Sequence, residues 1–394
     1  MTDRLAPLAC PWAELPPELL GDVSSRLSDA ADFVRFPAVC RPWRDALLSN
    51  ATRAMFLPWI LAPHDKTVLH SVINFAPSSY RHRSRNNIVL AEPPGASSTA
   101  GERNWVARTD GTAACVFTWI PEPGLIDLLT GAITRLHGFP EADETKQTME
   151  NPRGIVYNDG TIFLYSFTYD YTLENALDQY LTVAIWRPGD AEWKIMVHRV
   201  PVLGGYHLGY HGDKVLMPDF EANDDMFVEA WNHIFDETKY TLDYSYVLES
   251  CGELMCASVL VDHKFYHSAG DNHRSHAFLV KVRALKGVGG GGEMGWVERD
   301  NLSLDDRVFF LGCPASFAAD AAKLNMGGGC VFFTIGRSVF RYSLLDGEAQ
   351  LLMRQCPGCS IDRTCVWLQP QPTISPIQEI RERLARRTIQ EQEK

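Results

Sequence analysis

Residues 155–167 read IVYNDGTIFLYSF, two apolar runs on either side of Asn158, Asp159 and Gly160. Asp-Gly supplies the positive φ angles that a tight hairpin turn needs. Runs rich in Ile, Val, Phe and Tyr that are bounded by turn residues are typical of strands. This stretch therefore predicts a β-hairpin.

The same pattern of short apolar runs and turn residues continues from about Phe56 to Gln371. Hairpins in series, without a long helical pattern among them, indicate an all-β sandwich, barrel or propeller. A sandwich is usually nearer about a hundred residues, whereas blades of roughly 40–50 residues would number about six or seven here. We therefore expect a propeller with no helical layer. Further hairpins are predicted for Leu181–Trp186 with Glu192–Val197, Tyr246–Glu249 with Leu254–Val261, and Cys330–Ile335 with Ser338–Leu344.

A different pattern precedes the hairpins, from Trp12 to about Leu48. Pro16 and Pro17 stand where a first helical turn tolerates proline. Apolar residues then recur at helical spacing, which predicts three short helices. The first carries Leu19, Leu20, Val23 and Leu27, the second begins near Ser28 or Asp29 and ends at Phe36, and the third carries Val39, Trp43 and Leu47.

This helical segment resembles the F-box motif in the order and spacing of Leu15-Pro16, Leu19-Leu20, Val23, Leu27, Asp32-Phe33, Val39-Cys40 and Trp43-Arg44. The resemblance implies binding to an SKP-type adaptor and, through it, to a cullin. A unit this short cannot bury all its apolar residues by itself, so a leftover apolar face needs a partner. The residues expected to bind the adaptor are Leu15, Pro16, Leu19, Leu20, Val23, Leu27, Val39, Cys40 and Trp43.

The hairpin region is similar to the KIB-type β-propeller that follows F-boxes in a large plant family (domain of unknown function 295). The matching stretches lie in order along the chain. They are Leu57-Pro58-Trp59, Leu129-Thr130-Gly131, Phe139-Pro140, Val247–Leu254, Trp296, Arg307–Gly312 and Cys330–Phe333.

A last helix is expected in the tail, residues 375–394. Ser375 and Gln378 fit a capping box, and Pro376 fits the first helical position. The expected fold class is thus α+β multidomain: a three-helix F-box over residues 10–50, an all-β propeller over 56–371, and a short C-terminal helix.

The net charge and the distribution of apolar residues exclude some classes of function. A formal net charge of −12 disfavours non-specific binding to nucleic acid or an anionic membrane. No apolar run reaches the length of a membrane span, and residues 1–10 lack a signal-peptide pattern, so we expect a cytoplasmic or nuclear protein. The resemblance implies a non-catalytic substrate-recognition subunit of an SCF-type (SKP-cullin-F-box) ubiquitin ligase, whose propeller binds an unknown target protein. The alternative is a propeller enzyme or small-ligand sensor with the helices as a structural cap.

Three local motifs resemble binding sites, and none is expected to bind a cofactor or metal. Gly287–Gly292 satisfies Gly-x-Gly-x-x-Gly, but no helix follows it to hold a pyrophosphate. The histidines of 263–276 lack a Cys/His zinc framework. Cys356 and Cys359 form a lone Cys-x-x-Cys, which is more typical of a turn than of a redox site in this context.

The glycine and histidine stretches read as exposed insertions. Deleting Gly289–Gly291 should therefore change the free energy of unfolding by less than about 1 kcal/mol. Adding zinc should leave the melting temperature unchanged, because a ligand stabilises only the folded protein that binds it. A zinc-dependent gain of several degrees in a thermal melt would show instead that the histidines form a site.

Overall fold

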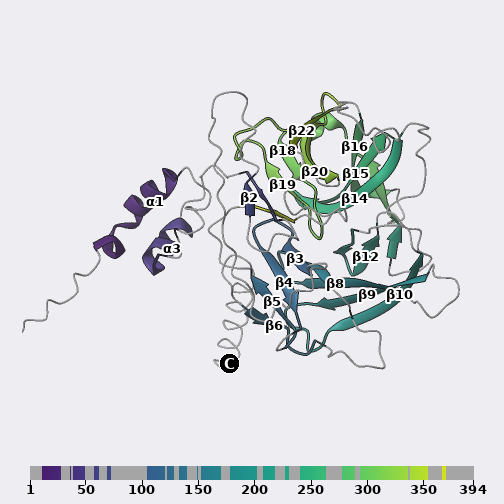
Figure 1. Cartoon of the computed structure of the whole chain (residues 1–394), viewed down its shortest axis with the longest axis horizontal. Helices are drawn as coiled ribbons and strands as arrows, with labels where there is room; N and C mark the ends of the chain where they lie inside the picture. The colour runs from purple at the N-terminus through teal and green to yellow at the C-terminus, as the bar shows by residue number, and fades with distance from the viewer. Residues whose placement is uncertain are drawn as a thin grey trace, which may run out of the picture.

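The computed structural model describes residues 11–27, 36, 39–48, 57–61, 69–71, 104–119, 122–127, 133–139, 149, 152–169, 178–201, 207–217, 227–229, 240–262, 277–288, 293–335, 338–353 and 366–369. Helices come first along the chain and strands follow, and Figure 1 shows the helices to one side of the strands.

The helical elements are a 3-10 turn η1 (Pro11–Glu14) and the helices α1 (Pro17–Ser25) and α3 (Arg41–Leu48). Pro17 occupies the start of α1, where its missing N–H costs no hydrogen bond. The first and third predicted helices are confirmed. Most of the segment predicted to hold the second lies outside the described residues, as does the predicted tail helix over 375–394.

The longest sheet has eight strands in the order β10-β9-β8-β7-β3-β4-β5-β6. It consists of two runs of four consecutive antiparallel strands, the arrangement of a propeller blade. A parallel pair, β3 with β7, joins the two runs. The strands are β3 (Trp105–Arg108), β4 (Ala114–Thr118), β5 (Gly124–Asp127), β6 (Ile133–Arg135), β7 (Arg153–Val156), β8 (Ile162–Tyr169), β9 (Asp178–Trp186) and β10 (Lys194–Pro201).

Three further sheets follow along the chain. One is a complete four-stranded blade, β14-β15-β16-β17, and another has the order β19-β18-β20-β21-β22 with β18 and β20 parallel. The strands are β11 (Gly209–His211), β12 (Lys214–Met217), β13 (Phe227–Glu229), β14 (Tyr240–Ser250), β15 (Glu253–Asp262), β16 (Phe278–Val288), β17 (Glu293–Glu298), β18 (Arg307–Phe310), β19 (Phe317–Asp320), β20 (Cys330–Ile335), β21 (Ser338–Ser343) and β22 (Glu348–Met353).

The four predicted hairpins are confirmed as β7–β8, β9–β10, β14–β15 and β20–β21. At the turn between β14 and β15, Cys251 and Gly252 have φ angles of 51° and 74°, as a two-residue hairpin turn requires. The described elements between residues 57 and 369 are strands and one 3-10 turn, η3 (Asn301–Leu304), so the expectation of no helical layer holds for this part. The mostly β, propeller-like fold is thus present, and the estimate of six or seven blades stays a prediction.

The glycine run and the histidine stretch both connect paired strands. Val288 of β16 pairs with Glu293 of β17 across residues 289–292, and Val261 of β15 pairs with Phe278 across residues 263–276. Both stretches, and Cys356 and Cys359, lie outside the described residues.

Central strands are buried on both faces. Phe163 and Tyr165 of β8 contribute to one apolar core, while the alternating residues Ile162 and Leu164 contribute to another. In β20 all six residues are buried, with Val331 and Phe333 in one core and Cys330 and Phe332 in a second. Side chains alternate between the faces of a strand, so each of these strands packs against a neighbouring layer on both sides.

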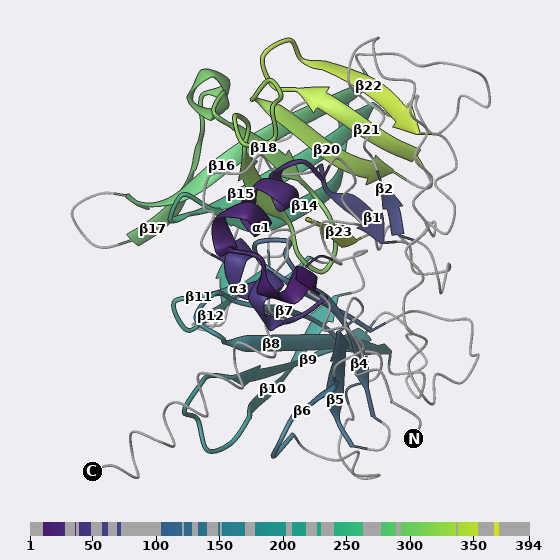
Figure 2. The ribbon, with the colours of Figure 1, turned by 90° about the vertical axis from the view of Figure 1, so that its left-hand side faces the viewer.

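The two ends of the β region meet in a small sheet, β2-β1-β23. Strand β1 (Trp59–Leu61) pairs with β2 (Leu69–Ser71) and, on its other edge, with β23 (Val366–Leu368) near the end of the described chain. Figure 2 shows this sheet between the sheets of β14–β22 and of β3–β10. The pairing closes the chain of blades on itself.

Trp367 holds this closure in place. Its side chain is 1% exposed, and its indole N–H donates to the carbonyl of Leu311 at 2.8 Å. Its ring also contacts Phe310 and Phe332, with centroids 5.4 and 6.2 Å away. One side chain of β23 thereby joins the sheet that contains β18 and β20.

Trp367→Ala should lower the free energy of unfolding by about 3–5 kcal/mol, because it leaves a cavity and an unpaired Leu311 carbonyl. The measurement is urea unfolding of the full chain. Leu302→Ala is the control, since Leu302 is 68% exposed and its truncation should change stability by less than about 0.5 kcal/mol. Equal midpoints for the two variants would contradict the role given to Trp367.

Candidate functional site

The helices form a small core of their own. Three side chains are buried together: Leu20 of α1, Ala46 of α3, and Phe36, which lies between the two helices in the sequence. Three partly buried residues pack against them, Leu15, Leu27 and Trp43. The ring of Trp43 lies 4.4 Å from that of Phe36 between centroids. Few residues supply this core, so its stability depends on each of them.

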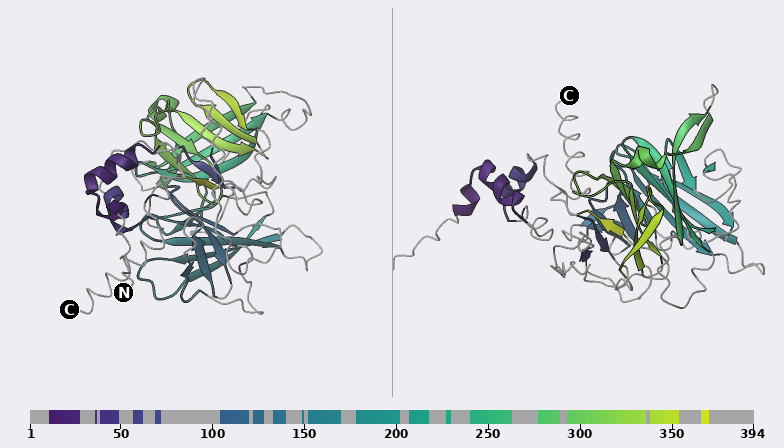
Figure 3. Two further views of the ribbon diagram at one scale, coloured as in Figure 1. Left: turned by 60° about the vertical axis from the view of Figure 1, so that its left-hand side comes forward. Right: turned by 90° about the horizontal axis from the view of Figure 1, so that it is seen from above.

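Trp43 also fixes the segment before α1. Its indole N–H donates to the backbone carbonyl of Trp12 at 2.9 Å. The backbone of η1 is thereby bound to α3, on which Trp43 lies. The right-hand view of Figure 3 shows these helices apart from the strands, as Figure 1 does.

Several large apolar side chains on the helices or next to them are exposed. Leu19 and Val23 stand four residues apart on α1 and are 49% and 36% exposed, and Val39, just before α3, is 59% exposed. Residues four apart lie on the same face of a helix. Four of the ten exposed large apolar side chains among the described residues belong to this short segment; they are Trp12, Leu19, Val23 and Val39. Exposed apolar side chains that gather in this way mark interaction surfaces.

The nine residues predicted to bind an adaptor therefore fall into three groups. Leu20 is fully buried in the helical core. Leu15, Leu27, Cys40 and Trp43 are half-buried, and all but Cys40 pack against that core. Pro16, Leu19, Val23 and Val39 are exposed. The structure thus places Leu15, one of the residues expected to bind the adaptor, partly in the core, and the assignment of the set to an adaptor stays a prediction.

Trp12 is an exposed apolar residue that the sequence analysis left out. The motif begins at Leu15, and a tryptophan before a predicted helix carries no sign of its exposure. Only the structure shows that its backbone is held while its side chain is 58% exposed.

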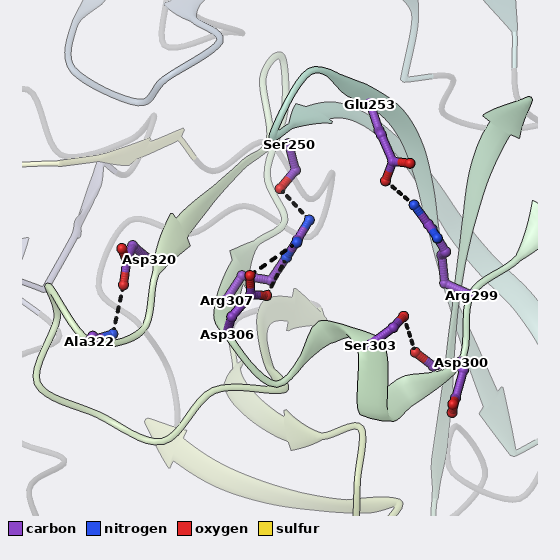
Figure 4. Close-up of polar contacts among 9 residues, drawn as sticks. All are labelled: Ser250, Glu253, Arg299, Asp300, Ser303, Asp306, Arg307, Asp320 and Ala322. Atoms are coloured by element: carbon purple, nitrogen blue, oxygen red, sulfur yellow. Dashed lines mark hydrogen bonds and ion pairs between the residues drawn. The ribbon is translucent and has the colours of Figure 1, made fainter.

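The β region carries a polar cluster around the β14–β15 turn, shown in Figure 4. The Arg307 side chain contacts the Asp306 carboxylate at 2.7 Å and donates to the Ser250 hydroxyl at 3.1 Å. The hydrogen bond from Arg307 lowers the pKa of Asp306 below its usual value. Arg299 forms an ion pair with Glu253 nearby. The Asp306–Arg307 pair joins neighbouring residues, whereas the contacts of Arg307 with Ser250 and of Arg299 with Glu253 join segments that are distant in the sequence.

A small cavity lies where β7, β11 and β14 approach one another. Its volume is about 40 Å³ and its lining includes Thr109, Tyr157, Tyr210 and Glu249. The Tyr157 hydroxyl accepts the backbone N–H of Tyr210 at 2.6 Å, and burial raises the pKa of this hydroxyl. Ligand pockets are usually several hundred cubic ångströms in volume, so this space suits water rather than a metabolite.

Among the residues that the structure describes, no group of three or more His, Cys, Asp or Glu could hold a metal ion. None of the described helices has both the length and the apolarity that crossing a bilayer requires.

Comparison with known families identifies both parts of the chain. A family model described as KIB1-4 beta-propeller matches residues 75–358, and a model described as F-box-like matches residues 12–52. The chain belongs to the KIB1-4 β-propeller family. The resemblance inferred from the sequence is thereby confirmed, and this family member combines the propeller with an F-box-like domain.

No curated protein matches the chain. Among solved structures, an apocarotenoid oxygenase variant from Synechocystis is 10% identical with a TM-score of 0.24, over 64% of this chain and 59% of that one. The lignostilbene dioxygenase of Pseudomonas brassicacearum is 9% identical with a TM-score of 0.27, over 65% and 61%. The present chain thus spans about three-fifths of each oxygenase, and likeness at this level carries no argument about activity.

Adjacent leucines provide a direct test of the helical core. Leu20→Ala should destabilise the helices by about 2–5 kcal/mol, because Leu20 is fully buried. The measurement is hydrogen exchange of the α1 amides in the full chain, which should lose protection. Leu19→Ala is the matched control and should leave that protection unchanged, since Leu19 faces outward. Equal loss of protection in both variants would show that the core is not built as described.

Proposed function

We propose that this protein is a substrate-recognition subunit of an SCF-type ubiquitin ligase. In this proposal the F-box-like helices bind an SKP-type adaptor, which links the chain to a cullin, and the propeller binds a target protein. The two family matches support the general class.

The observation that carries the proposal is the exposure of apolar side chains on and beside the helices. Leu19, Val23 and Val39 remain exposed to water, although the helical core contains only a few buried apolar residues. Removing apolar surface from water is worth roughly 25 cal/mol per Å². An adaptor that covers these side chains would supply stabilisation that the helices lack on their own.

The chain itself is proposed to be non-catalytic and to need no cofactor. The matches to an F-box-like domain and to a KIB1-4 beta-propeller support an adaptor role. Ubiquitin transfer would then be performed by other subunits of the ligase. We also propose that the protein acts in the cytoplasm or nucleus; its net charge of −12 disfavours non-specific binding to nucleic acid or an anionic membrane.

Removing exposed apolar side chains of α1 should weaken adaptor binding without unfolding the chain. The double variant Leu19→Ala with Val23→Ala should lose about 2 kcal/mol of binding free energy, which is about thirty-fold in Kd. The measurement is isothermal titration calorimetry of the full chain with a purified SKP-type adaptor, with circular dichroism to check the fold.

The matched control is Ile195→Ala with Val197→Ala. These two aliphatic residues of β10 are exposed to a similar degree, 40% and 47%, but lie on the propeller. Their truncation should leave the Kd unchanged. If the wild type shows no adaptor binding at all, the proposed function fails and the helices are a structural cap.

A further inference from the structure

A hollow lies over the hairpin of β21 and β22, in the sheet that also contains β18 and β20. Its volume is about 570 Å³, which is in the usual range of ligand sites. Strand β22 ends the order of this sheet, and none of the described strands pairs with its second edge. Figure 2 shows β22 at the margin of the sheet. The lining residues are Arg341, Ser343, Asp346 and Glu348–Leu351.

The strand register explains why polar side chains gather at this hollow. Side chains alternate between the two faces of a strand. Phe340 and Tyr342 of β21 are buried in an apolar core, against which Leu351 of β22 packs. The residues that alternate with them include Arg341, which stands opposite Gln350 across the hairpin. The polar face of the hairpin therefore carries a guanidinium with an amide beside it.

The guanidinium of Arg341 is half-buried and contacts a sulfur atom instead of a carboxylate. Its Nε and Nη2 atoms donate to the Cys330 Sγ at distances of 3.3 and 3.0 Å. The remaining N–H donors, at the end of the guanidinium, have no acceptor among the described residues. Arg187, Arg299 and Arg307 each have a carboxylate partner instead. Arg341 is thus held by its sulfur contact with its outer donors available.

The two carboxylates that line the hollow interact elsewhere. Asp346 accepts the hydroxyl of Ser343 at 2.9 Å, and the backbone N–H of Asp346 donates to the same hydroxyl at 3.2 Å. These two contacts close the turn between β21 and β22. Glu348 likewise interacts within the chain. Neither carboxylate forms an ion pair with Arg341 in the described structure, so neither neutralises its charge.

We propose that this hollow binds an acidic side chain, Asp or Glu, on an extended segment of the target protein. The inference deepens the proposed function, on which it rests for the identity of this partner. A guanidinium binds a carboxylate through two parallel hydrogen bonds, which the outer donors of Arg341 can supply. The amide of Gln350 would add a further donor.

The shape and charge of the lining favour this occupant. Four consecutive residues of β22 line the hollow beside an edge that no described strand covers, and extended segments bind along such edges. Asp346 and Glu348 lie in the same lining, and they disfavour a phosphate dianion more strongly than a single carboxylate.

Affinity selection of peptides by the purified full chain tests the site. The probe is a mixture of random dodecapeptides with blocked ends, in which a central glutamate is the sole acidic residue. The comparison mixture carries glutamine at the centre. Mass spectrometry should find about tenfold stronger retention of the glutamate peptides, because hydrogen bonds between charged groups are the stronger ones. The net charge of −12 repels acidic peptides in general, so such a preference reports a local site.

Three variants assign the preference to this hollow. Arg341→Gln should abolish it, whereas Arg135→Gln should retain it. Arg135 lies on β6, which ends the order of another sheet, so the control removes the same charge from a comparable position. Gln350→Glu should also abolish the preference, because it places a carboxylate opposite Arg341 within the chain. Gln350 is exposed, so this variant should keep its fold, which circular dichroism checks.

The outcomes separate the site from the proposed function. Equal retention of both mixtures by the wild type, or an unchanged preference in Arg341→Gln, would overturn the site. Adaptor binding, measured separately by calorimetry, would still leave the function standing. Stronger retention of glutamine peptides with a free C-terminal carboxylate, or of peptides with a central phosphoserine, would also overturn the inference. If the chain prefers glutamate peptides but binds no adaptor, the proposed function fails while the site is supported.

Discussion

Burial of strands on both faces is the constraint on which the β region depends. A strand such as β20 places Phe332 in one core and Phe333 in another, so its sheet is stable only if layers lie on both sides. An open row of such sheets would leave apolar faces exposed at its ends. Pairing of β1 with β23 joins the two ends of the region, which is why a three-residue strand late in the chain matters to sheets far from it in sequence.

This constraint also explains what the sequence could predict about the fold. A strand with one solvent-exposed face alternates apolar and polar residues. Residues 162–167 and 330–335 are instead apolar almost without interruption. Continuous runs with turn residues between them predict hairpins, and the four hairpins named from such runs are present. The parallel pairs β3–β7 and β18–β20 and the closure by Trp367 were not predictable. They join residues distant in the chain, and no local pattern records which distant strand will be the neighbour.

The helical site could be predicted only in part, for a related reason. Helical spacing shows that Leu19, Leu20 and Val23 belong to an apolar stripe, but it does not show where the chain's own core ends and the exposed face begins. That boundary falls between Leu19 and Leu20, and it follows from the positions of Phe36 and Ala46 around α1. Trp12 precedes the periodic pattern, so no spacing argument reaches it.

The two parts of the chain thus differ in how they bury their apolar residues. The β region uses its own sheets: β8 and β20 each have a packed layer on both sides, and Tyr157 and Trp367 give their polar atoms partners within the fold. The helical part buries Leu20, Phe36 and Ala46 but leaves Leu19, Val23 and Val39 in water. Because marginal stability makes one or two kcal/mol a large fraction of the total, a partner that covers the second group would stabilise the first. If the helices bind an adaptor as proposed, binding also stabilises their fold.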